Sequence, residues 1–184
     1  MTAGRLAGRI ALVTGASRGI GAAVARRFAR EDAKLVLVAR TTGGLEELDD
    51  DIRKISGEPA TLVPMDLTDY DKIDHMGALL FERFGHLDVL VGNAAMLGTL
   101  SPLGHTDPKV WERTLAVNLT ANWRLIRAMD PLLQRSKAGR AIFVTSTVGA
   151  EPRAYWSAYS VSKAGLEMLA RTYAAENAKT KVKV

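Results

Sequence analysis

The sequence of 184 residues contains no cysteine, which excludes disulfides and thiolate metal sites and suits a reducing compartment. It also lacks a long apolar run. The N-terminal stretch carries arginines around an apolar run of only Ile10–Val13, too short for a signal-peptide core or a membrane span. The three histidines show no paired spacing typical of metal ligands, so no metal site is predicted. We therefore expect a cytoplasmic protein with no membrane partner.

Aromatic residues make up only 6% of the chain, and no segment interleaves them with basic residues as nucleic-acid-binding motifs do. The net charge of +5 is unevenly spread: residues 1–40 hold eight Lys or Arg against two acids, and residues 41–90 hold four against twelve. This pattern indicates local fields, whereas an even basic coat would favour a polyanion binder. No nucleic-acid partner is predicted. A basic nucleic-acid binder, with steeply salt-dependent affinity, is a competing hypothesis.

Short β-rich apolar runs alternate with amphipathic helical patterns along the chain. Strands are predicted at 9–14, 34–39, 60–66, 87–92 and 140–146, and KVKV begins a sixth. Helices are predicted at 20–32, 44–55, 69–84, 107–134 and 157–178, the fourth with a break near Leu115. This alternation predicts one α/β domain over residues 1–184, with a doubly wound parallel sheet of the Rossmann type. Ligands of such sheets bind beyond the carboxyl ends of the strands.

A glycine-rich turn, TGASRGIG, lies between the first strand and the first helix. Gly15, Gly19 and Gly21 permit a tight turn and let backbone N–H groups approach a pyrophosphate at the helix N-terminus. The spacing GxxxGxG differs from the general GxGxxG fingerprint, so an ordinary strand-to-helix turn is the alternative. Its place in the first βαβ unit favours dinucleotide binding.

Two arginines decide which dinucleotide is predicted. Arg40 ends the second strand, nineteen residues after Gly21, where an NAD-binding chain of this fold carries an acid, and Arg18 lies in the glycine turn. Two guanidiniums can hold a 2′-phosphate through charge-assisted hydrogen bonds, so NADP(H) is predicted, with NAD(H) as the alternative. They can equally be solvated surface arginines. Asp66 can accept a hydrogen bond from the adenine amino group or serve local turn chemistry before the next helix.

A tyrosine and a lysine, Tyr159 and Lys163, lie four residues apart on one predicted helical face. A nearby ammonium favours the phenolate form of a tyrosine, which could then exchange a proton with an alcohol or an alkoxide. Alone, YxxxK is more typical of a surface pair. Ser146 can bond the substrate oxygen or form a Ser/Thr turn, and Asn118 can organise water toward Lys163 or cap a helix break.

The segments TGASRGIG, GNAA, VNL, Ser146 and YSVSK, in this order, resemble the short-chain dehydrogenase/reductase family of the classical type and its NADP-preferring members. The resemblance implies an oxidoreductase that transfers a hydride between NADP(H) and a small carbonyl or alcohol substrate. It implies that Tyr159 is the general acid/base, that Ser146 orients the substrate and that Lys163 also bonds the nicotinamide ribose. It further implies that Asn118 supports a water-linked proton relay. The cofactor-binding residues it implies are Gly15, Ser17, Arg18, Gly19, Ile20, Gly21, Arg40, Asp66, Leu67, Asn93, Ala94, Tyr159 and Lys163.

Two features depart from the family pattern. Ala95 stands where the family usually has glycine, which puts a positive φ at that position in question. Family members also complete a sixth strand, a loop and helix over the substrate, and a seventh strand, whereas this sequence ends at Val184. We expect the substrate-covering part to be missing from this chain. A catalytically silent Rossmann module that binds a nucleotide or a partner is therefore the competing hypothesis.

Apolar residues on two predicted helices exceed one narrow stripe. They are Trp123, Leu125, Ile126, Met129, Leu166, Leu169 and Tyr173. Most are predicted to face the sheet, and the surplus could form a helix-to-helix surface; the resemblance likewise implies a homodimer or homotetramer. Tyr155 and Trp156 precede the last helix and can either line a substrate pocket or pack a loop.

Overall fold

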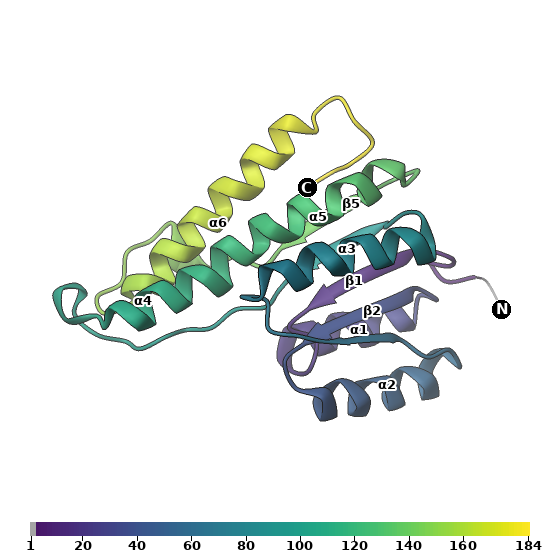
Figure 1. The fold of residues 1–184 in the computed structure, drawn as a ribbon, viewed down its shortest axis with the longest axis horizontal. Coiled ribbons are helices and arrows are strands. Elements are labelled where there is room, and N and C mark those ends of the chain that lie inside the picture. Colours follow the sequence, from purple (N-terminus) through teal and green to yellow (C-terminus); the bar gives the residue numbers. More distant parts are fainter. Residues whose placement is uncertain (1–2) are drawn as a thin grey trace.

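The computed structural model describes residues 3–184 and contains one sheet of five parallel strands (Figure 1). The expected doubly wound α/β fold is confirmed. The strands are β1 (Ile10–Thr14), β2 (Lys34–Ala39), β3 (Thr61–Pro64), β4 (Val89–Gly92) and β5 (Arg140–Phe143). The α-helices are α1 (Gly19–Ala29), α2 (Thr42–Ser56), α3 (Tyr70–Phe84), α4 (Pro108–Leu115), α5 (Ala121–Arg135) and α6 (Ser157–Glu176). Three short turns complete the order: the 3₁₀ turns η1 (Leu103–His105) and η3 (Thr147–Gly149), and the π-helical turn η2 (Ala116–Thr120).

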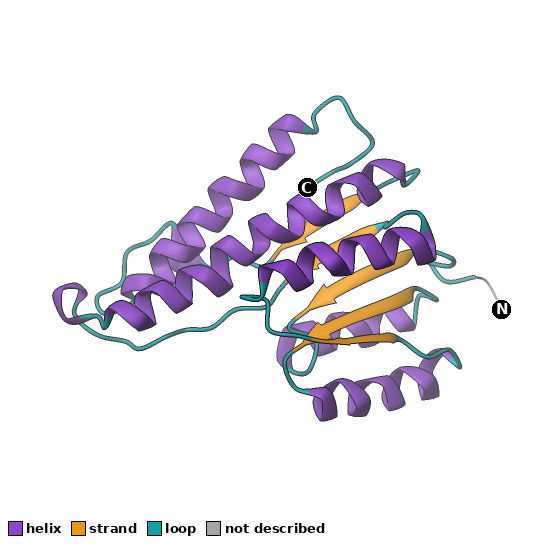
Figure 2. Ribbon diagram, viewed as in Figure 1, coloured by secondary structure: helices purple, strands orange, loops and turns teal. Residues whose placement is uncertain are grey.

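Helices cover both faces of the sheet, because the inner strands β1 and β2 are apolar on both sides (Figure 2). Side chains alternate along a strand, so Ala11 and Val13 of β1 pack with α1 and α2, while Ile10 and Leu12 pack with α3 and α5 on the other face. The predicted helix residues Leu125, Ile126, Met129, Leu166 and Tyr173 are buried, whereas Trp123 is 45% exposed. Within residues 3–184, no helix combines the length and apolarity needed to cross a bilayer.

The strand order β3-β2-β1-β4-β5 reverses direction at β1. The chain leaves β1 toward β2 on one side and returns to β4 on the other, so the carboxyl ends of β1 and β4 are neighbours at the point of reversal. In an open parallel sheet this point leaves a crevice between the connecting segments. The first glycine turn and the loop after β4 meet there.

One predicted helix break is present, and one predicted strand is shorter than expected. The long helix predicted at 107–134 is interrupted by the π-helical turn η2, which accounts for the predicted break near Leu115. The predicted sixth strand is only a single parallel bridge between Lys183 and Arg140 among the described residues. The Ala141 N–H donates to the Lys183 carbonyl at 2.9 Å, so the segment lies along the β5 edge.

Candidate active site

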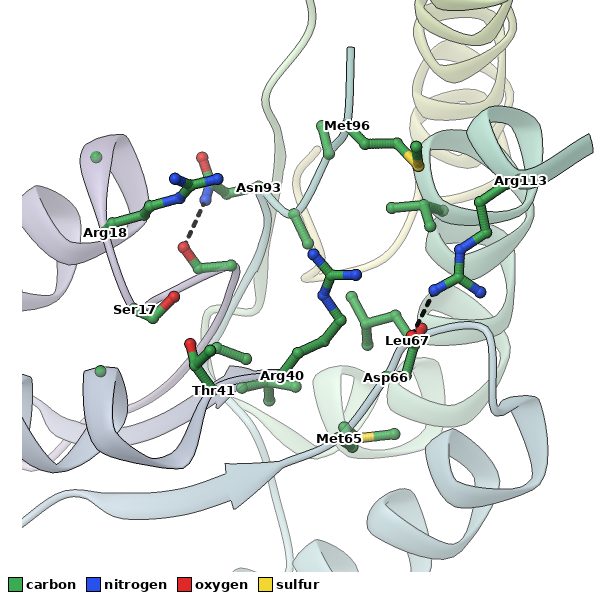
Figure 3. A pocket seen from close by; sticks show the side chains of 18 residues that line it. Ser17, Arg18, Arg40, Thr41, Met65, Asp66, Leu67, Asn93, Met96 and Arg113 are labelled. Atoms are coloured by element: carbon green, nitrogen blue, oxygen red, sulfur yellow. Dashed lines mark hydrogen bonds and ion pairs between the residues drawn. The ribbon is translucent and has the colours of Figure 1, made fainter. Parts of the chain in front are cut away.

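A cavity of about 680 Å³ opens at the point where the strand order reverses (Figure 3). Its walls come from the glycine turn, the end of β2, the loop after β3, the loop after β4 and the helices α4 and η2. It is lined by Gly15, Ser17, Arg18, Gly19, Val38, Ala39, Arg40, Thr41, Gly44, Met65, Asp66, Leu67, Asn93, Ala94, Ala95, Met96, Arg113 and Val117. The cavity therefore gathers residues from six separate stretches of the sequence.

The glycine turn and the loop after β4 are fastened together by Thr14 and Asn93. The buried Thr14 hydroxyl accepts hydrogen bonds from the N–H groups of Asn93 and Ala94, at 3.0 and 3.1 Å, and donates to the Val91 carbonyl. The Asn93 amide donates to the carbonyls of Thr14 and Gly15, at 2.9 and 3.3 Å. Asn93 thus lines the cavity while its amide nitrogen holds the turn in shape.

The glycines of the turn meet different requirements. Gly15 and Gly19 have φ of 63° and 58°, a conformation that costs any other residue backbone strain. Nothing lies within 4 Å of a Cβ built on Gly19, so the backbone there is open to a ligand. Gly21 does not line the cavity, and a Cβ on it would lie 2.3 Å from the Gly15 carbonyl oxygen. Gly21 is therefore required for the close approach of α1 to the turn.

Arg18 and Arg40 both reach the cavity without a carboxylate partner. Within residues 3–184, no ion pair is formed by either guanidinium. Arg40 leaves the end of β2 and extends into the cavity in Figure 3. The residues present fit a phosphorylated dinucleotide, because a glycine turn at a helix N-terminus and two guanidiniums without ionic partners among residues 3–184 both favour anions.

Asp66 lies in the cavity wall, but its carboxylate is engaged within the protein. One oxygen accepts hydrogen bonds from the N–H and the hydroxyl of Thr68, each at 2.9 Å. The other oxygen accepts from the Arg113 guanidinium of α4 at 2.5 Å. Burial raises the pKa of Asp66, and the hydrogen bonds from Thr68 and Arg113 lower it, with a net shift below the ordinary range. Local turn chemistry is thus present at Asp66, together with an ion pair that joins two walls of the cavity.

Beside the cavity lies a buried polar cluster, which we define as Asn118, Ser162 and Lys163. Asn118 sits in the π-helical turn η2, and its amide bonds both backbone groups of Met96, at 2.8 Å to the N–H and 2.9 Å to the carbonyl. Its nitrogen also donates to the Ser162 hydroxyl at 2.9 Å, and that hydroxyl donates to the Tyr159 carbonyl at 2.7 Å. Met96 lines the cavity, so these bonds connect the cavity wall to the turn of α6 that carries Tyr159.

Lys163 lies on the same turn of α6 and is 2% exposed. Its ammonium donates to the Val144 carbonyl at 2.6 Å, just beyond β5, and lies 5.7 Å from the centre of the Tyr159 ring. Burial lowers the pKa of Lys163 to about 8. The ammonium and the phenol predicted from the sequence to share one helical face are therefore neighbours.

Tyr159 and Ser146 have side-chain oxygens without a hydrogen-bond partner among residues 3–184, although the backbone of each is fixed. Ser146 precedes η3, and η3 is pressed against α6: a Cβ on Gly149 would lie 3.0 Å from the Lys163 backbone. Trp156 packs edge-to-face on Tyr159, with 5.8 Å between ring centres. Neither the phenol nor the hydroxyl is therefore engaged within the part of the chain that the structure describes.

A sequence profile described as short chain dehydrogenase matches residues 9–184. The chain belongs to the short-chain dehydrogenase/reductase family. It is 34% identical over 170 residues to the uncharacterized oxidoreductase YciK of Escherichia coli K12, covering 91% of this chain and 68% of that protein.

Two solved structures share the fold closely. A protein from Pseudomonas syringae assigned to the short-chain dehydrogenases has a TM-score of 0.95 and 37% identity, covering 98% of this chain and 76% of that one. One from Shigella flexneri 2a strain 301, complexed with NADP, has a TM-score of 0.95 and 31% identity, covering 100% of this chain and 77% of that one. This short-chain dehydrogenase is accordingly an oxidoreductase.

Most of the residues that the family resemblance implied for the cofactor line the cavity of this short-chain dehydrogenase. They are Gly15, Ser17, Arg18, Gly19, Arg40, Asp66, Leu67, Asn93 and Ala94. Ile20 is 59% exposed and, with Gly21, Tyr159 and Lys163, lies outside the lining. Ala95 has no positive φ, so the alanine at that position carries no backbone strain. Within residues 3–184, no cluster of three or more potential metal ligands occurs.

Three residues that hold the site together were not predicted from the sequence. Thr14, Arg113 and Ser162 act through partners 44 or more residues away in the chain, which no local motif reveals. The two aromatic residues before α6 have different surroundings. Tyr155 is 60% exposed, has φ of 72° and lines a second cavity of about 420 Å³, while Trp156 packs on Tyr159. A positive φ at a bulky residue is a strained conformation.

Proposed function

We propose that this short-chain dehydrogenase reduces a ketone or an aldehyde with NADPH and catalyses the reverse oxidation of the alcohol. The observation that carries the proposal is the pair formed by Tyr159 and the buried ammonium of Lys163, 5.7 Å from the ring centre. An ammonium held near a phenol stabilises the phenolate that remains after proton transfer. A surface pair would be solvated, whereas Lys163 is held in the fold by the Val144 carbonyl.

The cofactor assignment rests on the arginine-lined cavity. Arg18 and Arg40 would hold the 2′-phosphate, the glycine turn would face the pyrophosphate, and the loop that carries Asn93 and Ala94 would form the opposite wall. The NADP complex of the Shigella flexneri relative supports this choice. When bound, NADPH supplies the hydride that reaches the carbonyl carbon.

The side chains of this chain would handle the proton. The Tyr159 phenol donates its proton to the oxygen of the forming alcohol, and Lys163 stabilises the resulting phenolate. Ser146, whose hydroxyl has no partner among residues 3–184, holds the reacting oxygen. Asn118 holds Met96 and Ser162, and through them the wall of the cavity and the turn of Tyr159. In the oxidation direction the same phenolate takes the proton from the alcohol.

Replacing Tyr159 by phenylalanine tests the mechanism. We expect Tyr159→Phe to lower the rate of NADPH oxidation, measured with a panel of ketones and aldehydes, by about a thousandfold or more, because the proton donor is lost. NADPH affinity, measured by fluorescence titration, should stay within about twofold of that of the wild type, because Tyr159 does not line the cavity. Tyr70→Phe is the matched control, since Tyr70 begins α3 outside the cavity lining.

Two results would contradict the proposal. Turnover of Tyr159→Phe at the wild-type rate would exclude Tyr159 as the general acid/base. Tight NADPH binding by the wild type with no turnover of any carbonyl compound in the panel would favour the catalytically silent module.

We further propose that the protein acts as a homo-oligomer. Trp123 of α5 is 45% exposed and Met168 of α6 is 61% exposed, so both long helices present large apolar side chains to solvent. Light scattering at several protein concentrations measures the assembly, and a monomer at all of them would refute it.

A further inference from the structure

We propose that Arg113 is a specificity-determining residue of the cofactor cavity: it neutralises Asp66 and so preserves the preference of the cavity for the dinucleotide with the additional phosphate. This inference rests on the proposed NADPH-dependent function. It assigns a role to a residue that no local sequence motif singles out.

The Arg113 guanidinium makes two hydrogen bonds, one from each terminal nitrogen. One terminal nitrogen donates to the Asp66 carboxylate and the other to the Thr68 hydroxyl, each at 2.5 Å. Thr68 in turn donates to the other Asp66 oxygen, so the three side chains form a closed set. A planar guanidinium suits such a two-point contact better than an ammonium does. In Figure 3 Arg113 reaches Asp66 from α4, on the side of the cavity away from Arg18.

The charges that line the cavity determine how strongly it attracts anions. Three guanidiniums, from Arg18, Arg40 and Arg113, line it, and Asp66 is the only carboxylate among its lining residues. The Arg113–Asp66 pair is close to neutral, which leaves the two unpaired guanidiniums to attract anions. Without Arg113, the Asp66 carboxylate would offset one of them. The affinity for NADPH would then suffer more than that for NADH, because NADPH carries the additional phosphate.

Asp66 and Arg113 are both about two-fifths exposed, at 37% and 39% of their side chains. Solvent and salt therefore screen this charge, and the expected effect is modest. By Coulomb's law, an uncompensated carboxylate and a dianionic phosphate in the same cavity repel enough to change relative affinity by about three- to tenfold at low ionic strength. At high salt this fold-change in relative affinity should approach one.

Arg113 also joins α4 to the loop after β3, and a purely structural role would make a different prediction. Loosening of the cavity wall would weaken NADPH and NADH binding alike and would not respond to the charge at Asp66. A direct contact between Arg113 and the phosphate would lower relative NADPH affinity, but removal of the Asp66 charge would not restore it. Charge compensation alone predicts restoration in the double variant.

The experiment measures the dissociation constants of NADPH and NADH by fluorescence titration at low and high salt. We expect Arg113→Gln to reduce the preference for NADPH about three- to tenfold at low salt. Adding Asp66→Asn should return the preference to within about twofold of that of the wild type, and Asp66→Asn alone should increase it. Arg127→Gln is the matched control, because Arg127 pairs with Asp74 outside the cavity.

An equal loss of both affinities in Arg113→Gln, an unchanged preference, or a loss that Asp66→Asn does not restore would each overturn the proposal. Should Arg113→Gln fail to fold, Asp66→Asn alone still decides, since a preference that does not rise is a negative result. Failure of the proposed function appears separately, in the wild type: no NADPH binding, or tighter NADH binding, would remove the basis of both.

Discussion

The arginine-lined cavity and the buried polar cluster meet at Met96, yet they are built in opposite ways. In the cavity, Arg18 and Arg40 have no ionic partner among the described residues, and their neighbours come from loops and strand ends. In the cluster, Asn118, Ser162 and Lys163 are fully buried and every one of them is hydrogen-bonded within the protein. The cavity thus presents charged side chains to solvent, and the cluster is a part of the core.

Substitutions in the cavity and in the cluster should therefore affect different properties of the protein. The charges of the cavity contribute little to folding because they are solvated, so changes there should alter binding and leave stability nearly unchanged. The groups of the cluster are buried, so changes there should alter turnover and stability together. Three substitutions test this separation, beginning with the one expected to have the largest effect.

Lys163→Met should have opposite effects on turnover and on stability. Loss of the ammonium should reduce turnover by about a thousandfold, because the phenolate loses its stabilising charge. At pH 7 the free energy of unfolding should rise by about 1 to 2 kcal/mol, because the folded wild type bears the cost of a buried ammonium. Urea denaturation and steady-state kinetics measure the two effects.

The pH dependence has a defined sign. Burial lowers the pKa of Lys163 from 10.5 to about 8, so between these values the folded protein holds fewer protons than the unfolded chain. The wild type should therefore gain stability from pH 8 to 10.5, and Lys163→Met should lack that gain. Lys72→Met, at an exposed lysine paired with Asp69, should keep it. A variant that is less stable than the wild type at pH 7 would show that Lys163 stabilises the fold.

Arg40→Asp should change cofactor choice and leave the fold intact. We expect the affinity for NADPH to fall about 10- to 100-fold relative to that for NADH, because a carboxylate replaces the guanidinium that faces the 2′-phosphate. The free energy of unfolding should change by less than about 0.5 kcal/mol. Fluorescence titration and urea denaturation measure these quantities.

Lys179→Asp makes the same change in net charge at an exposed position outside the cavity and serves as the control. Unchanged NADPH affinity in Arg40→Asp would remove the assignment of the phosphate site. A loss of stability as large as that of a core substitution would break the contrast between cavity and cluster.

Ser162→Ala should have the smallest effect on function, and it should also lower stability. It removes the acceptor of the Asn118 amide and the donor to the Tyr159 carbonyl, which should cost about 1 to 3 kcal/mol of stability. Turnover should fall about tenfold or less as Tyr159 loses support, with NADPH affinity within about twofold of that of the wild type. Ser160→Ala is the matched control, because the Ser160 hydroxyl oxygen is buried without a partner among the described residues. Equal behaviour of the two variants would exclude a positioning role for Ser162.

The strands, the glycine turn and the sheet type could be predicted from the sequence because local patterns determine them. The predicted second strand matches β2 at both ends, and GxxxGxG lies where positive φ is required at Gly15 and Gly19. The candidate cofactor residues that line the cavity could be proposed from the sequence because most of them follow the ends of strands, where a parallel sheet gathers ligand contacts. Gly21 is the exception, since its role depends on the packing of α1 against the Gly15 carbonyl.

The remaining contacts could not be predicted because distant segments create them. Arg113 meets Asp66 across 47 positions of the chain, and Asn118 meets Ser162 across 44. A helical asparagine could be recognised as unusual, but the π-helical turn that aims it at Met96 depends on tertiary packing. The packing of Trp156 on Tyr159 and the place of Tyr155 in the second cavity likewise depend on tertiary contacts.

The π-helical turn η2 also fixes the rotational phase between the two helices that flank it. One residue corresponds to about 100° of helical rotation, so a chain one residue shorter at this turn would present a different face of α4 to the rest of the protein. Arg113 would then swing away from Asp66, while the apolar face of α5 stayed in the core. The single extra residue of η2 therefore sets the orientation of α4 relative to α5. It allows α4 to place Arg113 in the cavity wall while α5 packs in the core.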